Sequence, residues 1–138
     1  MGILEGKKGL ILGVANQKSI AWGIAQACKA EGATLGFTYL NEAMDKRVRP
    51  LAESVDAAMI VECDVQNDDH ISRLHDETKA SLGELDFVIH SVAFASGDDL
   101  KGRFHETSRD GFKLAMDVSA YSLAVSYTHL TLPTTPYV

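Results

Sequence analysis

Cysteine is scarce in this sequence, and its placement excludes several classes of site. The 138 residues contain only Cys28 and Cys63, and these form no C-x-x-C pair. Zinc sites and thioredoxin-like redox sites need closely spaced cysteines or histidines, so the sequence predicts no metal site. Both cysteines stand among apolar neighbours, which indicates buried free thiols rather than a disulfide.

Long apolar runs and an excess of positive charge are also missing. No stretch approaches the roughly 20 apolar residues of a membrane span, and residues 1–8 are too short and too polar for a signal peptide. The net charge is −6 at pH 7, which argues against a nucleic-acid-binding surface. We therefore expect a cytoplasmic protein that binds neither membrane nor nucleic acid.

Strand-like and helix-like segments alternate along most of the chain. Apolar runs predict strands at residues 8–13, 34–39, 58–63 and 87–90, and helical patterns occupy residues 20–31, 41–54, 68–82 and 107–125. Four such units predict an α/β fold in which a parallel sheet carries helices on both faces. The sequence therefore predicts one domain that ends near residue 125.

Individual residues predict where these helices begin, end and face the core. Asn67 and Thr107 are expected N-caps, Gly83 is expected to stop the third helix, and Pro50 to end or kink the second. The expected buried stripes are Ile20, Ile24, Ala27 and Cys28 in the first helix, Ile71, Leu74, Thr78 and Leu82 in the third, and Phe112, Ala115, Met116, Ser119 and Leu123 in the fourth.

Residues 126–138 differ from the rest of the chain. They contain four threonines, Pro133 and Pro136, but no Asp, Glu, Lys or Arg. Either proline would interrupt a helix or a strand. We therefore expect an aberrant tail that is not part of the fold.

The turn between the first strand and the first helix, residues 13–23, is a candidate dinucleotide site. Gly13 removes a side chain where the strand ends, and the backbone N–H groups that begin the helix would face an anion. Ser19 is placed to cap this helix and to donate its hydroxyl to a phosphate oxygen, and Gly23 would let the helix pack tightly on the sheet. The spacing departs from G-x-G-x-x-G. The alternative is that Gly13 only ends a strand and Ser19 only caps a helix.

Five segments together carry a family resemblance. They are the pattern Gly13-x5-Ser19-x-Ala21 followed by Gly23-Ile24-Ala25, residues 1–7, Cys63-Asp64-Val65, residues 90–95, and residues 111–122. In order and spacing they resemble the NADH-dependent enoyl-acyl-carrier-protein reductases of bacterial type II fatty acid synthesis, a divergent branch of the short-chain dehydrogenases/reductases. The resemblance implies a Rossmann-type doubly wound parallel sheet, truncated here after about four strands.

The resemblance also implies a set of binding residues for NADH. Gly13, Ser19 and Ile20 would contact the pyrophosphate and the neighbouring ribose, Asp64 would accept from the adenine amino group, and Val65 would pack on the adenine ring. Val92 would lie near the ribose on the nicotinamide side, and Ala95 would line the substrate pocket through its backbone. For Asp64 the alternative is that it caps the turn after its strand.

Leu40 is expected beside the adenine ribose, where many members of the family carry a polar residue. No acidic residue precedes Glu42 and no Lys or Arg precedes Lys46 after the second strand, so a 2′-phosphate has no obvious partner. NADH is therefore expected over NADPH, mainly because of the resemblance.

The chain offers no catalytic pair of the kind that the resemblance implies. In the family a Tyr binds the thioester carbonyl and a Lys seven positions later holds the nicotinamide ribose, both on one helix. Here only Tyr39 and Lys46 have that spacing, and Tyr39 ends a predicted strand. We therefore assign no catalytic residue and expect the amino-terminal part of a reductase, inactive alone, whose full-length relatives form homotetramers and act on enoyl thioesters of acyl-carrier protein. The alternatives are a fragment of another short-chain dehydrogenase/reductase or a non-catalytic nucleotide-binding module.

Overall fold

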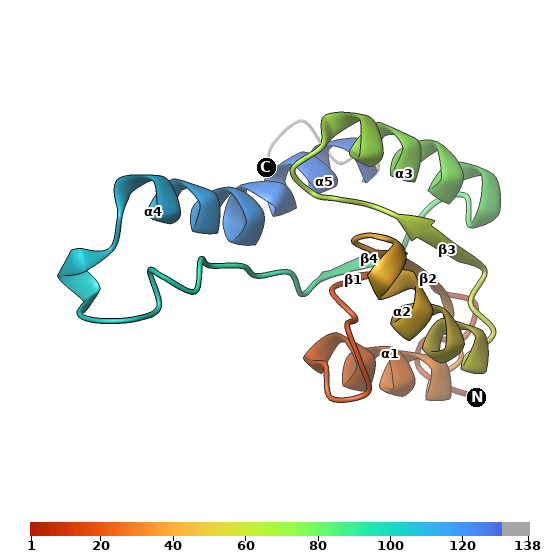
Figure 1. Cartoon of the computed structure of the whole chain (residues 1–138). Coiled ribbons are helices and arrows are strands. Elements are labelled where there is room, and N and C mark those ends of the chain that lie inside the picture. The colour runs from red at the N-terminus through yellow and green to blue at the C-terminus, as the bar shows by residue number, and fades with distance from the viewer. Residues whose placement is uncertain (131–138) are drawn as a thin grey trace.

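The computed structural model describes residues 1–130 (Figure 1). Four strands alternate with helices and a helical segment follows. The strands are β1 (Lys8–Leu12), β2 (Thr34–Tyr39), β3 (Met59–Glu62) and β4 (Phe87–His90). The helices are α1 (Ile20–Ala30), α2 (Glu42–Ser54), α3 (Asp68–Ser81), the 3-10 turn η1 (Phe104–Glu106), α4 (Arg109–Met116), the π-helical turn η2 (Asp117–Tyr121) and α5 (Ser122–Leu130).

The four strands form one parallel sheet in the order β3-β2-β1-β4. Alternate residues of β1 supply two cores: Ile11 packs with α1 and α2 on one face, and Leu10 and Leu12 pack with α3 and α5 on the other. Figure 1 shows these two helix layers on opposite sides of the sheet. The predicted α/β fold with a Rossmann-type doubly wound parallel sheet is confirmed.

Helix α3 has the ends and the buried face that its sequence predicts. The Asn67 side chain accepts hydrogen bonds from Asp69 N and His70 N, at 3.0 and 3.3 Å, and Gly83 beyond the other end has φ +78°. The predicted stripe is buried: Ile71, Leu74, Thr78 and Leu82. Here one clear apolar stripe on a polar helix fixes which face meets the sheet.

Helix α1 turns a different face to the sheet from the one predicted. Ile20 is 78% exposed, whereas Ala21, Trp22 and Ala25 are buried. Trp22 lies against Phe37 of β2, with 6.4 Å between the ring centroids. The small side chains of Ala21 and Ala25 allow the helix axis to approach the sheet. The expectation that Gly23 mediates this approach is wrong, because a Cβ there would meet open space.

Pro50 lies inside α2, which continues to Ser54 instead of ending there. The proline is exposed, so the carbonyl that loses its helical partner can turn toward water. Val48 and Ala52 are buried on either side of it, and Arg49 pairs with Asp45 at 2.8 Å. These contacts hold the helix together across the missing hydrogen bond.

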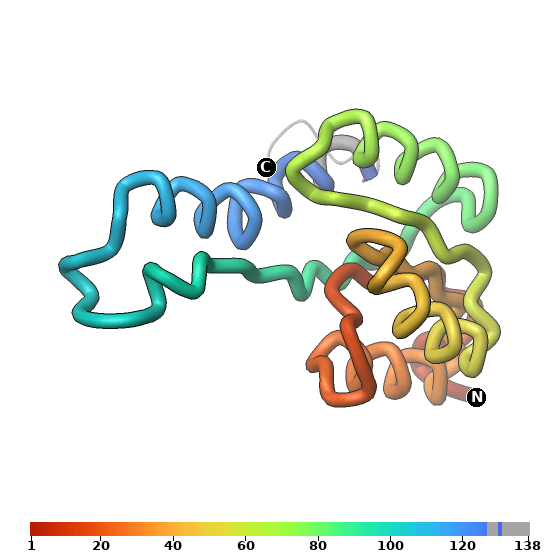
Figure 2. The backbone as a smooth tube through the Cα atoms, in the orientation of Figure 1, coloured from red at the N-terminus to blue at the C-terminus, as the bar shows by residue number. Residues whose placement is uncertain are grey.

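Helix α4 differs from the prediction at its start and along its face. Ser108, not Thr107, is the N-cap, because its Oγ accepts from Gly111 N at 3.0 Å. Three side chains of the predicted buried stripe are about half exposed: Phe112, Met116 and Leu123. With residues 91–108, α4 forms an arm that runs away from the sheet (Figures 1 and 2). The sheet therefore does not cover that face.

Helix α5 passes the boundary at residue 125. It continues to Leu130, and both Ser126 and Leu130 are buried. Residues 126–130 therefore belong to a packed helix, contrary to the expectation for this part of the tail, because the face that carries Ser126 and Leu130 packs beside α3. The rest of the predicted tail, 131–138, lies outside the described residues. Within residues 1–130, no helix has the length and apolar character needed to cross a membrane.

Candidate functional site

A cleft of about 450 Å³ opens where the four parallel strands end. Its lining comes from the segments after each strand and from the π turn η2: Gly13, Val14, Ala15, Thr38, Tyr39, Leu40, Met44, Cys63, Asp64, Val65, Gln66, Ser91, Val92, Ala93, Phe94 and Val118. Carboxyl ends of parallel strands share one edge of the sheet, and open α/β sheets bind ligands there. Five of the predicted site residues meet in this cleft: Gly13, Leu40, Asp64, Val65 and Val92.

Gly13 fits closely between two segments of the cleft. Its φ of +106° is one that side chains disfavour, and a Cβ would overlap the backbone carbonyl of Ser91. The turn after β1 therefore contacts the chain after β4 directly, and only glycine fits there.

Ser19 organises the turn after β1 rather than capping α1 with its side chain. Its Oγ accepts hydrogen bonds from Ala15 N at 2.9 Å and Asn16 N at 3.0 Å, and it makes no side-chain cap bond to the helix. Ser19 is therefore the N-cap residue of α1 by position, as expected, but its side chain makes no cap hydrogen bond because the N–H groups of the turn occupy its oxygen. Among residues 1–130 the hydroxyl proton of Ser19 has no acceptor, so it is available to an anion. Ile20 does not line the cleft but projects into solvent beside the turn.

Asp64 and its neighbours form the wall after β3. Asp64 Oδ1 accepts from Gln66 N at 3.0 Å, which is the turn-capping role that was the alternative for this residue. The Asp64 N–H donates to His70 Nδ1 at 3.1 Å, so that ring nitrogen carries no proton. Since Asp64 also lines the cleft, capping the turn and facing a ligand are compatible roles.

The chain after β4 forms the opposite wall. Val92 lines the cleft, while Ala95 lies just beyond the lining residues. Phe94 N donates to Ser119 Oγ at 3.0 Å, which ties this wall to the π turn η2. Ser119 belongs to the predicted buried stripe of its helix, and its contact with a loop 25 positions away leaves no local sequence signal.

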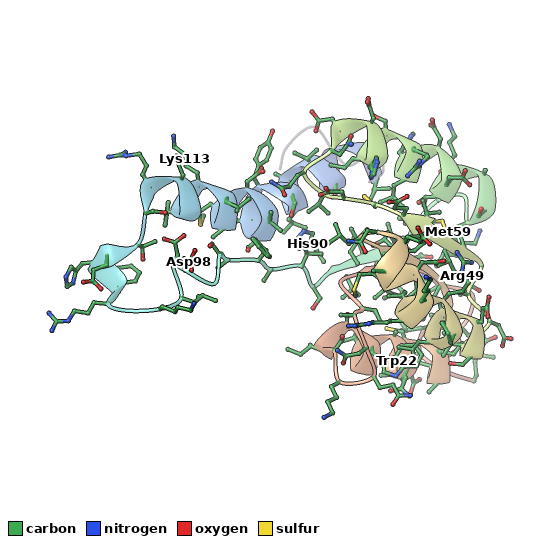
Figure 3. The ribbon with its side chains drawn as sticks, in the orientation of Figure 1. Trp22, Arg49, Met59, His90, Asp98 and Lys113 are labelled. Atoms are coloured by element: carbon green, nitrogen blue, oxygen red, sulfur yellow. The ribbon has the colours of Figure 1, made fainter. Side chains whose placement is uncertain are left out.

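His90, at the end of β4, faces the helical segment that carries η2 and α5 (Figure 3). Burial lowers the pKa of its imidazole, because a desolvated cation is disfavoured. Cys63 beside the cleft is also buried, and burial raises the pKa of its thiol to about 11. The two cysteines are free thiols. Residues 1–130 contain no cluster of three or more His, Cys, Asp or Glu side chains that could hold a metal ion.

Tyr39 and Lys46, the one pair with catalytic spacing, do not lie on a common helix. Tyr39 ends β2 and Lys46 belongs to α2, where it pairs with Glu42 at 3.8 Å. Arg49 lies over the Tyr39 ring, 6.0 Å from its centroid. The geometry does not give this tyrosine a lysine partner.

Comparisons with known proteins agree in sequence and in structure. The profile of the family described as "Enoyl-(Acyl carrier protein) reductase" matches residues 13–133. The enoyl-[acyl-carrier-protein] reductase [NADH] of Aquifex aeolicus is 47% identical over 133 residues, covering 96% of this chain and 49% of that protein. The Rickettsia felis counterpart is 48% identical over 122 residues, covering 88% and 47%.

Solved structures of such reductases superpose closely on this chain. The Aquifex aeolicus enzyme has a TM-score of 0.90 at 45% identity, covering 93% of this chain and 56% of that one. The Anaplasma phagocytophilum enzyme in complex with NAD has a TM-score of 0.89 at 45% identity, covering 94% and 50%. A Bacillus cereus enzyme with NADP+ and an indole naphthyridinone has a TM-score of 0.90 at 43% identity, covering 94% and 51%. The chain spans about half the length of the curated relatives it matches.

Proposed function

The chain belongs to the enoyl-(acyl carrier protein) reductase family, and we propose that it supplies the cofactor-binding part of an NADH-dependent reductase. The reaction would reduce the trans-2 double bond of enoyl thioesters carried by acyl-carrier protein in fatty acid elongation. NADH would supply the hydride for the β-carbon. This chain's own contribution would be to bind and orient that cofactor.

The observation that carries the proposal is the cleft at the carboxyl ends of the four strands. Gly13 brings backbone to the position where a pyrophosphate would lie, and the Ser19 hydroxyl proton is available beside it. Asp64, Val65 and Leu40 line the end that we assign to adenosine, and Val92 lines the end that we assign to the nicotinamide ribose. Ile20 and Ala95 would border the pyrophosphate and the substrate.

We propose NADH rather than NADPH as the cofactor. The curated relatives carry NADH in their names, although one solved relative was determined with NADP+. Leu40 offers no charge to a 2′-phosphate. Lys46, the first cation after it in the sequence, is paired with Glu42, and Arg49 is paired with Asp45.

We assign no catalytic residue within these 138 residues. Within residues 1–130 no helix holds a Tyr and a Lys seven positions apart, so the enolate that develops during reduction would lack its expected donor. We propose that the dinucleotide-binding unit spans the expected residues 1–125 together with the packed end of α5 to residue 130, that the protein is cytoplasmic, and that full-length members of the family assemble as homotetramers.

Isothermal titration calorimetry of the purified chain with NADH, and separately with NADPH, measures the two affinities and tests the proposal. We expect NADH to bind more tightly than NADPH, with no oxidation of NADH when a crotonyl thioester is added. Absence of NADH binding would contradict the cofactor role. Turnover by the chain alone would contradict the assignment of no catalytic residue. Turnover gained when the carboxyl-terminal half of the Aquifex aeolicus relative is added would distinguish a reductase part from a non-catalytic nucleotide-binding module.

A further inference from the structure

The π turn η2 contacts both loops that form the walls of the cleft. π turns insert an extra residue into a helical turn and occur frequently at functional sites. Asp117 Oδ2 accepts from Gln66 Nε2 at 3.3 Å, in the wall after β3. Val118 is buried and lines the cleft itself. Ser119 binds Phe94 in the wall after β4. Three consecutive residues therefore connect the two walls.

Ser119 binds the backbone of Phe94 twice through one hydroxyl. Its Oγ accepts from Phe94 N at 3.0 Å and donates to Phe94 O, which lies 3.3 Å away. Residues 92–95 lie outside helices and strands, and the nearest backbone hydrogen bonds are those of Ser91 N with Leu12 O before them and of Ser96 O with Asp99 N and Leu100 N after them. A side chain that satisfies both polar groups of one loop residue therefore restricts the path of that loop.

The turn itself is held from the other side. Ser122 Oγ donates to Val118 O at 2.6 Å, so it accepts the proton of His90 Nε2, 2.7 Å away. The end of β4 thus fixes η2, and η2 in turn fixes the loop that follows β4. The wall after β3 has further contacts of its own, since Asp64 binds both Gln66 and His70.

We propose that η2 positions the loop of residues 92–95 for the nicotinamide end of the cofactor, with Ser119 as the positioning residue. This inference rests on the proposed function, because it assigns a role to one wall of the same cleft. Ser119 acts through the Phe94 backbone. Its loss would therefore affect ligands that reach the loop of residues 92–95 and spare those that contact only the wall after β3.

Binding of NADH and of AMP to the full 138-residue chain separates these effects. AMP carries the adenine, one ribose and one phosphate, and has no nicotinamide end. We expect Ser119→Ala to weaken NADH binding about tenfold, the loss expected for one or two neutral hydrogen bonds, and to leave AMP binding unchanged. Ser119→Thr, which keeps the hydroxyl, should restore NADH binding. Equal weakening of both ligands, or of neither, would overturn the inference.

Ser108→Ala provides a matched control, because Ser108 caps α4 and does not line the cleft. It should change neither affinity. Hydrogen exchange of the Phe94 amide measures its hydrogen bond to Ser119 without any ligand. We expect faster exchange in Ser119→Ala than in the unmodified chain. Unchanged exchange would overturn the positioning role alone. An unmodified chain that binds neither NADH nor AMP would overturn the proposed function, and with it the cofactor part of this inference.

Discussion

The Nε2 atom of His90 lies 2.7 Å from the hydroxyl oxygen of Ser122 and joins the end of β4 to the start of α5. Ser122 donates its own proton to Val118 O, so the imidazole is the donor in this contact. Burial lowers the pKa of His90 below its ordinary 6.5. The folded chain therefore favours the neutral ring.

This burial gives the stability of the fold a defined pH dependence. Because the folded pKa is lower than the unfolded pKa of 6.5, the unfolded chain takes up the proton first as the pH falls. The free energy of unfolding should therefore decrease as the pH drops below 6.5. Urea unfolding at about pH 7.5 and about pH 5.5 measures this change across the range in which an ordinary histidine titrates.

His90→Gln is the control for this prediction. A glutamine amide can still donate to Ser122 but does not titrate, so the loss of stability between the two pH values should be smaller in the variant. Asp86, whose pKa is lowered by hydrogen bonds from Lys7 and the Lys8 backbone, loses its contribution only in more acidic solution. An identical pH dependence in both proteins would show that His90 is not the responsible group.

Gly13→Ala should destabilise the fold strongly. The new Cβ would overlap Ser91 O, and φ at this position is +106°, so we expect a loss of about 2–4 kcal/mol and loss of NADH binding. Gly23→Ala is the contrasting variant. Position 23 is helical and open to solvent, so alanine should stabilise the chain by about 0.5–1 kcal/mol. Thermal unfolding measures both effects. Unfolding temperatures that shift in the same direction in the two variants would contradict the conclusion that position 13 is crowded and position 23 is open.

Asp64→Ala should weaken NADH binding about tenfold by removing one acceptor for the adenine amino group. It should also lower stability by about 1 kcal/mol, because Gln66 N loses its partner. Asn67→Ala removes a neighbouring cap and should cost about 0.5–2 kcal/mol with no change in affinity. Calorimetric titration with NADH measures the affinity of each variant and so distinguishes the role of Asp64 from that of Asn67. Equal affinities of Asp64→Ala and the unmodified chain would leave Asp64 with the turn-capping role alone.

The two thiols should react at different rates in the folded chain. Cys63 is buried and its pKa is raised to about 11, whereas Cys28 is half-buried. Because the thiolate is the reactive form, iodoacetamide should modify Cys28 first, and peptide mass spectrometry would measure both rates. In urea the difference should disappear. Equal rates in the folded chain would contradict the burial of Cys63.

Some elements could be predicted from the sequence because their signals are local. Asn67, Gly83 and the stripe through Ile71 and Leu74 act within one helix of otherwise polar residues. The phase of α1 could not be predicted in this way. Ile20, Ala21, Trp22, Ile24 and Ala25 surround that helix with apolar side chains, so its periodicity does not identify one buried face. In the structure, Ala21, Trp22 and Ala25 face the sheet.

For the cleft, the sequence predicted residues at strand ends but not the contacts that arrange them. Gly13, Leu40, Asp64, Val65 and Val92 meet in one cleft because parallel strands end at one edge. Ser119 and Ser122 resemble any other helical serines, and their partners lie 25 and 32 positions away. The exposed face of α4 could not be predicted for the same reason. An apolar stripe predicts that a helix face is buried, but it does not identify the element that covers that face.

The position of β1 between β2 and β4 has a consequence for how the chain folds. The contact of Lys8 with Asp86 beside the β1–β4 pairing joins residues 78 positions apart. The chain therefore loses the conformational entropy of closing this long loop before β4 can pair with β1. During synthesis β1 can pair with β2 early, while its other edge stays open until β4 emerges. Refolding should therefore be slow for a chain of this size, as in other folds dominated by distant contacts. The early intermediate, a three-stranded sheet of β3, β2 and β1 in which β1 is an open edge strand, would be the species most exposed to aggregation.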